Sequence, residues 1–246
     1  MKGVILAGGK ATRLRPLTWV TNKHLLPIYN KPMVFYALES MQRAGVKEVL
    51  ITSSDDHLSH FINLLKSGKD FGLRLSYAIQ EDEGSGIPQA ITLAEDFCGG
   101  EKILVILGDN IFTHNLSQAV ADFEKQKKGA KVFAKRMPTH SKQYGVIEVD
   151  AKGNVLSVEE KPDQPKSDLA QTGIYMYDTQ VYNFVHTLKP SKRGELEVTD
   201  LNNLYLKQKT LTCEIVEGWW VDAGTSFDEL LRANNLVAQL VKTGNK

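Results

Sequence analysis

Through the first half of the chain, short continuous apolar runs alternate with segments whose apolar residues recur at helical spacing. The runs predict strands at residues 3–6, 46–53, 73–80 and 102–109. The helical spacing predicts helices at residues 31–45, 56–68 and 88–97. Runs without polar interruption suit strands covered on both faces, and strands joined by single helices need crossover connections. The pattern therefore predicts a doubly wound, mostly parallel sheet.

The second half has a different pattern, with strand-like runs and little helix between them. Strands are predicted at residues 130–137, 144–150, 155–160 and 172–178, and helices at 195–209 and 226–244. The sequence "DAKGN" at residues 150–154 is typical of a hairpin turn. Because no Ser-, Gly- or Pro-rich linker separates the halves, we expect a single domain over residues 1–246. Its predicted fold class is α/β, with a Rossmann-like, mostly parallel mixed sheet that carries an antiparallel extension.

Composition excludes several classes of function. Of 246 residues, 42% are hydrophobic and 24% charged, which indicates a globular protein rather than a disordered or fibrous one. A formal net charge of +1 provides no general basic field, so we expect neither nucleic acid nor a membrane as partner. No apolar run approaches the roughly 18 residues of a membrane span. With only two cysteines, Cys98 and Cys213, the sequence favours a cytoplasmic protein with reduced thiols.

The segment "GVILAGGKATRLRPLT" is the first candidate for chemistry. Gly8 and Gly9 end the first predicted strand, and three cations follow closely, among them Lys10 and Arg13. The spacing fits neither the P-loop nor the dinucleotide-binding fingerprint, because Lys10 and Arg13 occupy positions that would need glycine. Bare backbone N–H groups and a guanidinium at a strand end are nevertheless the parts of a phosphate cradle. From these residues alone, phosphate binding and an ordinary surface turn are equally open.

Several further blocks, taken in order, make the chain similar to the sugar-nucleotide pyrophosphorylases, whose signature is L-A-G-G-x-G-T-R-L followed by K-x-L-L-P. The blocks are "LAGGKATRLRPLT" from residue 6, "NKHLLPIYNKPM" from 22, "LGDN" from 107, "YGV" from 144, "EEKP" from 159, "TGIYMYD" from 172, "KPSKRGELEVTD" from 189 and "WWVDAGT" from 219. The resemblance implies the nucleotide-diphospho-sugar transferase type of fold. It also implies the family's reaction, in which a sugar 1-phosphate attacks the α-phosphorus of a nucleoside triphosphate and pyrophosphate leaves.

Such a reaction depends on charge neutralisation rather than on a general base. A sugar phosphate, with a second pKa of about 6, is already mostly dianionic at neutral pH. The protein must hold two anions in line and neutralise the leaving group. The resemblance therefore implies Mg²⁺ bound by Asp109 and Asp222, with Arg13, Lys23 and Lys161 as the catalytic cations. Without it, Asp109 would be explained as the N-cap of a following helix and Asp222 as a turn residue.

The resemblance also assigns binding residues. Those expected at the nucleotide are Leu6, Gly8, Gly9, Arg13, Gln80, Gly86 and Asp109. Those expected at the sugar phosphate are Asn110, Gly145, Glu160, Lys161, Thr172, Gly173 and Arg193. Gln80 is expected to recognise the base, because an amide can both donate to and accept from the imide edge of a pyrimidine. Apart from the family, a solvated Gln80 and a Lys161 paired with its neighbouring glutamates are the simpler interpretations.

Two departures from the family pattern bear on the nucleotide. Ala11 stands where the family has glycine, so we expect either a φ below zero there or a backbone displaced from the phosphate. Pro88, in "GIPQA", removes an N–H beside the expected base pocket and weakens the choice between thymine and uracil. "NKHLLP" is closer to the members that use dTTP. The expected substrates are thus dTTP, with UTP as the alternative, and glucose 1-phosphate.

Two other interpretations belong to different classes of protein. A non-catalytic sensor of nucleotide sugars could keep the same fold and site, although it would tolerate loss of one of the expected charged residues. An NAD-dependent enzyme is disfavoured by the missing dinucleotide fingerprint. As a further partner we expect copies of the chain itself, in a homodimer or homotetramer.

Overall fold

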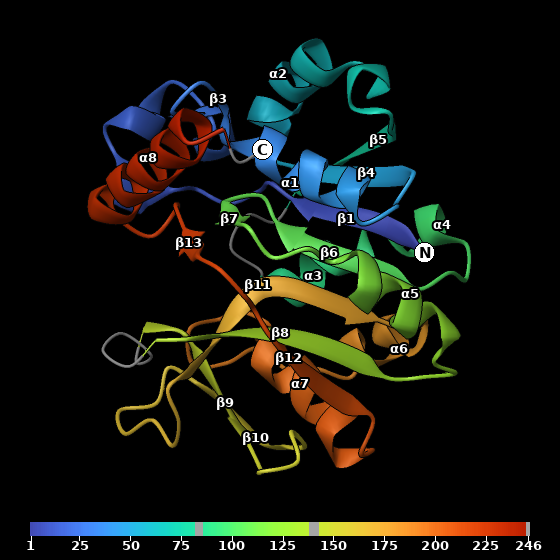
Figure 1. Ribbon diagram of the computed structural model, residues 1–246. Helices are drawn as coiled ribbons and strands as arrows, with labels where there is room; N and C mark the ends of the chain where they lie inside the picture. Colours follow the sequence, from blue (N-terminus) through green and yellow to red (C-terminus); the bar gives the residue numbers. More distant parts are fainter. Residues whose placement is uncertain (82–85, 138–142, 245–246) are drawn as a thin grey trace.

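The computed structural model describes residues 1–81, 86–137 and 143–244, and its main feature is a nine-stranded sheet (Figure 1). The parallel part of the sheet consists of β1 (Lys2–Leu6), β4 (Glu48–Ser53), β5 (Arg74–Ile79) and β6 (Ile103–Leu107). The crossovers are made by α1 (Met33–Arg43), α2 (Asp55–Leu65), α3 (Ile87–Thr92) and α4 (Glu95–Cys98). The predicted strands and crossovers are confirmed. The helix expected at 88–97 is instead two short helices that both turn an apolar side to the core.

The antiparallel extension is also confirmed. It consists of β8 (Ala130–Arg136), β9 (Gly145–Val149), β10 (Val155–Glu160) and β11 (Leu169–Tyr177). β11 pairs antiparallel with β6, so the two halves share one sheet in the order β10-β9-β11-β6-β1-β4-β5, with β8 beside β11. Not predicted were α6 (Gln180–Val185) and the edge strand β12 (Leu211–Ile215), which pairs parallel with β8.

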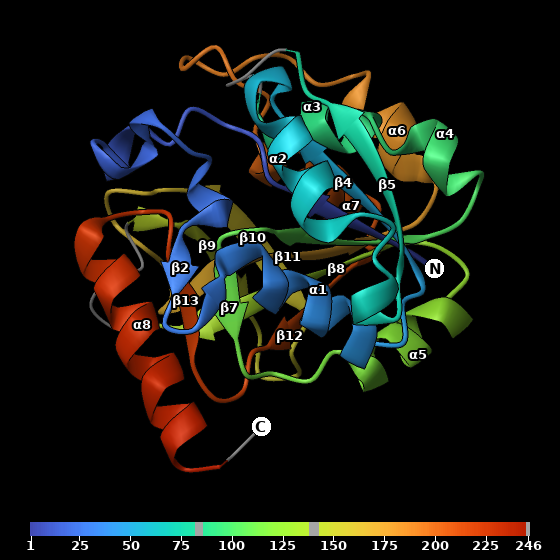
Figure 2. The same ribbon diagram turned by 90° about the horizontal axis from the view of Figure 1, so that it is seen from above.

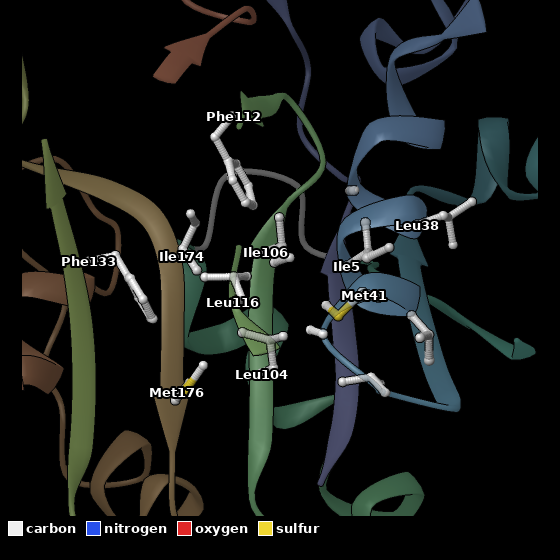
Figure 3. Packing of buried hydrophobic residues seen from close by; sticks show 14 of the residues in the cluster. Ile5, Leu38, Met41, Leu104, Ile106, Phe112, Leu116, Phe133, Ile174 and Met176 are labelled. Carbon is white, nitrogen blue, oxygen red and sulfur yellow. The ribbon is translucent and has the colours of Figure 1, made fainter. Parts of the chain in front are cut away.

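Helices cover both faces of the sheet (Figure 2). On one face, α1 and α5 (Ser117–Lys125) pack on alternate residues of the strands; Figure 3 shows Ile5, Leu104 and Ile106 against Leu38, Met41 and Leu116. On the other face lie α3, α4, α6 and α7 (Val198–Lys207). Continuous apolar runs were therefore a sound indication of strands buried on both faces. Among the described residues no helix is both long and apolar enough to cross a membrane.

A separate pair of short strands brings two distant segments of the chain together next to the candidate site. β7 (Asn110–Phe112) pairs antiparallel with β13 (Trp220–Asp222), although 110 residues separate Asn110 from Trp220. The final helix α8 (Phe227–Lys242) packs on this pair and on the hairpin of β2 (Pro27–Ile28) and β3 (Lys31–Pro32), through a third apolar cluster. The described residues also form four 3₁₀ turns: η1 (Thr12–Leu14), η2 (Leu17–Trp19), η3 (Lys23–Leu25) and η4 (Lys69–Phe71).

A polar group anchors the loop before α5 to the edge of the sheet. Glu214 of β12 lies between His114, whose Nε2 is 3.1 Å from Oε1, and Lys131, whose Nζ is 2.6 Å from Oε2. His114 Nδ1 accepts from the Glu217 N–H, so the ring proton resides on Nε2 and is donated to Glu214. The hydrogen bond from His114 and the Lys131 ammonium outweigh burial and lower the pKa of Glu214.

This arrangement predicts a pH-dependent contribution to stability. A carboxylate with a folded pKa below its unfolded value of 4.5 adds stability that is present above 4.5 and lost as the pH falls through the folded pKa. Glu214→Gln should therefore be less stable than the natural protein at about pH 7, and the difference should shrink at about pH 3.5. Urea unfolding at both pH values measures this; a difference that stays constant would contradict it.

Candidate active site

Asp109 lies at the centre of the site, between the end of β6 and the start of β7. This position refutes the N-cap interpretation, because a strand and not a helix follows it. The side chain is buried, and its two oxygens have different partners: Oδ2 accepts from Lys23 Nζ at 2.5 Å, and Oδ1 accepts from Asn110 Nδ2 at 3.2 Å. The Asp109 carbonyl also accepts from the Ala223 N–H at 2.9 Å, which ties the end of β6 to the end of β13.

Asp222 ends β13 directly across from Asn110, so strand pairing brings the two predicted metal ligands into one place. Gly224 makes this possible. A Cβ on Gly224 would lie 2.2 Å from Asp109 Oδ2 and 2.8 Å from Lys23 Nζ, so only glycine leaves room for the ion pair. The Asp222 carbonyl accepts from the Thr225 hydroxyl at 2.5 Å, so this residue also forms the turn that the simpler interpretation expected.

The cluster of Asp109, Asp222 and Lys23 contains one more negative than positive charge when both carboxyls are ionised. Burial raises the pKa of Asp109, but the Lys23 ammonium outweighs burial and the pKa falls to about 2. Burial, followed by the Asp109 carboxylate, raises the pKa of Asp222 to about 7. Burial would lower the pKa of Lys23, but the two carboxylates raise it, so the ammonium stays protonated. The single positive charge of Lys23 therefore cannot neutralise both carboxylates.

This donor set suits a divalent cation. No group of three or more His, Cys, Asp and Glu side chains gathers anywhere in the described part of the chain. Mg²⁺, however, is commonly bound through one or two carboxylates, with water and substrate oxygens at its other positions. The uncompensated carboxylate charge also favours a cation at this point. Asp109 and Asp222 are the residues that could hold one.

The glycine-rich loop after β1 has left-handed backbone at two positions, one of them its alanine. Gly9 has a φ of +97°, and Ala11 has φ +45° and ψ +37°, in the left-handed region. Of the two alternatives expected at Ala11, a φ below zero is therefore excluded, and a backbone displaced from the phosphate stays a prediction. The Thr18 hydroxyl donates to the Ala11 carbonyl at 2.8 Å and supports this turn. Arg13, in η1, is exposed, and its charge acts on both Lys23 and Asp222.

A cavity of about 420 Å³ opens beside this loop and extends to the start of α2. Its lining residues are Gly9, Lys10, Ala11, Arg15, Thr18, Trp19, Thr21, Asn22, Asp56 and His57. Neither Asp109 nor Asp222 lines it, so the cavity adjoins the charged cluster without containing it.

The residues expected at the nucleotide gather at the carboxyl ends of the parallel strands. Gln80, buried, follows β5, and a Cβ on Gly8 would lie 2.2 Å from its Oε1, so the two are in direct contact. Leu6 accepts from the Gly108 N–H at 2.9 Å, beside Asp109. Gly86 has a φ of +99° and no room for a Cβ against the Leu196 carbonyl. The structure thus places Gln80 against Gly8 and Leu6 beside Gly108, whereas Gly86 contacts Leu196.

The residues expected at the sugar phosphate come from the antiparallel part. Glu160 ends β10 opposite Gly145, accepts from the Thr199 hydroxyl at 2.7 Å and lies 3.5 Å from Lys161 Nζ. Lys161 is exposed and has a φ of +42°, a strained value for a residue with a side chain. Thr199 is a neighbour that the sequence did not suggest.

Thr172 and Gly173 lie where the pairing of β11 with β8 is irregular. The Thr172 hydroxyl donates to the Phe133 carbonyl at 2.8 Å, and the Gly173 N–H donates to Asn110 Oδ1 at 2.8 Å. Asn110 Oδ1 also accepts from the Trp220 indole at 2.6 Å. Asn110, which is almost fully buried, therefore joins β7, β11 and β13, in addition to contacting Asp109.

Arg193 is bound by two neighbouring carboxylates. Its guanidinium binds Glu195 at 2.8 Å and Glu197 at 3.1 Å, and the side chain is half exposed. The carboxylates, above all Glu197, outweigh the effect of burial and raise the pKa of Arg193.

Comparisons with known proteins show the family of the chain. The nucleotidyl transferase family matches residues 2–239. The chain is 45% identical over 232 residues to glucose-1-phosphate thymidylyltransferase of Neisseria gonorrhoeae, covering 92% of this chain and 78% of that one. It is 42% identical over 240 residues to the protein of the same name from Mycolicibacterium smegmatis, covering 96% and 82%.

Two solved structures share the fold. A Bacillus anthracis protein assigned as a glucose-1-phosphate thymidylyltransferase, in complex with sucrose, superposes with a TM-score of 0.90 at 44% identity, covering 96% of this chain and 94% of that one. UDP-glucose pyrophosphorylase in complex with UDP-glucose gives a TM-score of 0.86 at 26% identity, covering 97% and 98%. The predicted fold class is confirmed.

The left-handed conformation of Ala11 predicts a stabilising substitution. A side chain in this region costs about 1 to 2 kcal/mol, and glycine removes that cost while adding about 0.4 to 1 kcal/mol of entropy to the unfolded chain. Ala11→Gly should raise the free energy of unfolding by about 0.5 to 1 kcal/mol, measured by denaturant titration. Ala151→Gly, in an exposed turn without a positive φ, is the control and should lower it. A destabilised Ala11→Gly protein would show that the methyl contacts outweigh the strain.

Proposed function

The chain belongs to the nucleotidyl transferase family, and from that premise we propose that it transfers a thymidylyl group from dTTP to glucose 1-phosphate, giving dTDP-glucose and pyrophosphate. Two relatives that carry the name of this activity are similar over nearly all of the chain. The observation that carries the proposal is the cluster in which Asp109 is paired with the Lys23 ammonium while Asp222, from a distant part of the sequence, lies close enough to act on the same charge. With a divalent cation bound there, such a cluster suits the reaction of two anions.

In the proposed reaction, an oxygen of the sugar phosphate forms a bond to the α-phosphorus, and the bond from that phosphorus to the oxygen bridging to the β-phosphorus breaks. The dianionic sugar phosphate needs no base to remove a proton, so the protein's task is positioning and neutralisation. Mg²⁺ held by Asp109 and Asp222 would supply positive charge to the reacting phosphates. Lys23 and Arg13 add fixed cations on the triphosphate side.

The sugar phosphate would be bound from the antiparallel part of the sheet. Lys161 and Arg193 provide the cations, Glu160 accepts from sugar hydroxyls, and the main chain at Gly145 and Gly173 lines the hexose. Because Arg193 is bound to Glu195 and Glu197, an incoming phosphate would replace carboxylates as its partner. The Thr172 hydroxyl already donates to a carbonyl, so we assign that residue to the shape of β11 and to its main-chain groups.

A uridylyltransferase is the second candidate, favoured by the structural likeness to UDP-glucose pyrophosphorylase. Thymine and uracil present the same imide edge, so Gln80 would recognise both and would not separate them. The higher identity to the thymidylyl enzymes places dTTP first.

We also propose that the protein is a single domain that self-associates in the cytoplasm. The two halves share one sheet, which supports a single domain over residues 1–246. The exposed apolar side chains Phe227, Leu231 and Val241 of α8 suit burial against a second copy in a homodimer or homotetramer. The free thiols of Cys98 and Cys213 suit a cytoplasmic location.

The proposal predicts that both aspartates are essential for pyrophosphate release. Asp109→Asn and Asp222→Asn keep the shape and remove a charge, so each should reduce turnover of dTTP and glucose 1-phosphate by about a hundredfold or more, because metal-assisted stabilisation is worth several kcal/mol. A chelator should abolish turnover by the natural protein, and Mg²⁺ should restore it. Asp122→Asn, exposed on α5, is the matched control and should be fully active.

Two results would contradict the proposal in different ways. Normal turnover by either variant with Mg²⁺ present would show that the metal pair is misplaced. Tight binding of dTDP-glucose without pyrophosphate release from any pair of nucleoside triphosphate and sugar 1-phosphate would identify a sensor instead of an enzyme.

The Gln80 amide, which lies against Gly8, is proposed to recognise the pyrimidine base, and this assignment predicts which nucleoside triphosphates the protein uses. The natural protein should use dTTP and UTP but not ATP or GTP. Gln80→Leu should raise KM for dTTP about tenfold, the loss of one to two hydrogen bonds, and leave KM for glucose 1-phosphate unchanged. Turnover of ATP and GTP by the natural protein, at rates near that of dTTP, would overturn the assignment.

A further inference from the structure

Asn22 and His24 flank Lys23 in the sequence, and both side chains are almost fully buried. Asn22 donates through Nδ2 to the Ala7 carbonyl at 3.0 Å, and its Oδ1 accepts from the His24 N–H at 2.9 Å. These two main-chain partners fix the orientation of the amide, because a carbonyl needs a donor and an N–H needs an acceptor. The Asn22 oxygen must therefore face His24.

The His24 ring makes a second hydrogen bond to Asn22. Its Nδ1 is 2.6 Å from Asn22 Oδ1, and because that oxygen can only accept, Nδ1 carries the proton and donates it. Burial, assisted by the neighbouring Lys23 charge, lowers the pKa of His24 to about 3, so the ring is neutral and keeps this single tautomer. Neither residue has a role in the binding sites described above.

The hydrogen-bonded pair of Asn22 and His24 contacts the ends of three strands. The Ala7 carbonyl, just beyond β1, also accepts from the Ser53 hydroxyl at the end of β4, at 3.2 Å. On the other side the His24 ring lies against Gly108, at the end of β6, where a Cβ would come within 2.8 Å of the ring carbon Cδ2. The residue after Gly108 is Asp109, the partner of Lys23. Through Ala7 and Gly108, Asn22 and His24 thus contact the main chain after β1 and the main chain directly before Asp109.

We propose that Asn22 and His24 are positioning residues, whose hydrogen-bonded side chains fix the main chain on either side of Lys23 and so direct its ammonium to Asp109. A lysine side chain has four carbons and about 2 kcal/mol of rotamer entropy, so it holds a fixed direction only when its main chain is held. The catalytic consequence rests on the proposed function, but the placement of Lys23 can be measured without it.

The test compares two substitutions of the same shape. His24→Leu removes the donor to Asn22, whereas His24→Asn keeps a donor close to the position of Nδ1, and both leave the same space where the ring was. Tyr205→Phe is the control for stability alone: it deletes a buried hydroxyl that donates to Asp178 at 2.9 Å, among residues with no part in the site. Three quantities are measured for each protein: the melting temperature, kcat and KM for both substrates, and the rate at which acetic anhydride acetylates Lys23, followed by mass spectrometry.

His24→Leu should lower kcat about tenfold to a hundredfold with both KM values within about threefold, as expected for misplacement of a group by up to 1 Å. It should also acetylate at Lys23 several-fold faster than the natural protein. His24→Asn should recover most of both losses although its cavity is the same. Tyr205→Phe should lower the melting temperature without changing kcat or Lys23 acetylation.

If His24→Leu and His24→Asn behave alike, the hydrogen bond does not position Lys23 and the proposal is wrong. The same holds if His24→Leu only melts earlier, as the Tyr205→Phe control does. If the natural protein releases no pyrophosphate, the proposed function fails, and the acetylation rates alone then decide whether Asn22 and His24 position Lys23.

Discussion

The structure around the site depends on one electrostatic constraint: Asp109 and Asp222 are brought together at the carboxyl edge of the sheet, and the Lys23 ammonium beside them is paired with Asp109. At an effective dielectric constant of about 20, two like charges 4 Å apart repel by about 4 kcal/mol. Lys23 offsets this for Asp109, whose pKa falls to about 2, but not for Asp222, whose pKa rises to about 7. The folded chain therefore keeps a position where a further positive charge would be strongly favoured. The small residues around the pair follow from the same constraint, because Gly108 and Gly224 leave room for His24 and for Lys23 with Asp109.

The fold meets this constraint by bringing together strand ends that are far apart in the sequence. β6 delivers Asp109 at the carboxyl edge of the parallel sheet, where open α/β sheets bind their ligands. The short pair of β7 and β13 then places Asp222 beside it, and α8 covers the other side of that pair. Asn110 joins the pair to β11 through the Gly173 N–H, so the proposed metal side and the expected sugar side share one buried amide. Movement on one side is thereby opposed by bonds to the other.

Much of this architecture could be predicted from the sequence, because long elements buried on both faces leave continuous apolar runs and helices leave a regular spacing. β7 and β13 could not, since three residues are too few to show a period. Motifs predicted the charged residues of the candidate site, yet not their hydrogen-bond partners. That Asn22 contacts Ala7, and that His24 lies against Gly108, are long-range contacts that leave no local signal. At Ala11, only the first of the two expected alternatives, a negative φ, is excluded: the surrounding loop, with the Thr18 hydroxyl on the Ala11 carbonyl, outweighs the residue's own preference.

The charge imbalance at Asp109 and Asp222 would form a divalent cation site. Anomalous diffraction from crystals of the protein grown with Mn²⁺ and dTTP tests this, with Mn²⁺ in place of Mg²⁺ because it scatters anomalously. We expect one Mn²⁺ peak within coordination distance of a carboxylate oxygen from each aspartate, and its loss in Asp222→Asn crystals grown in the same way. A Mn²⁺ bound to the triphosphate alone, with neither carboxylate as a ligand, would contradict it.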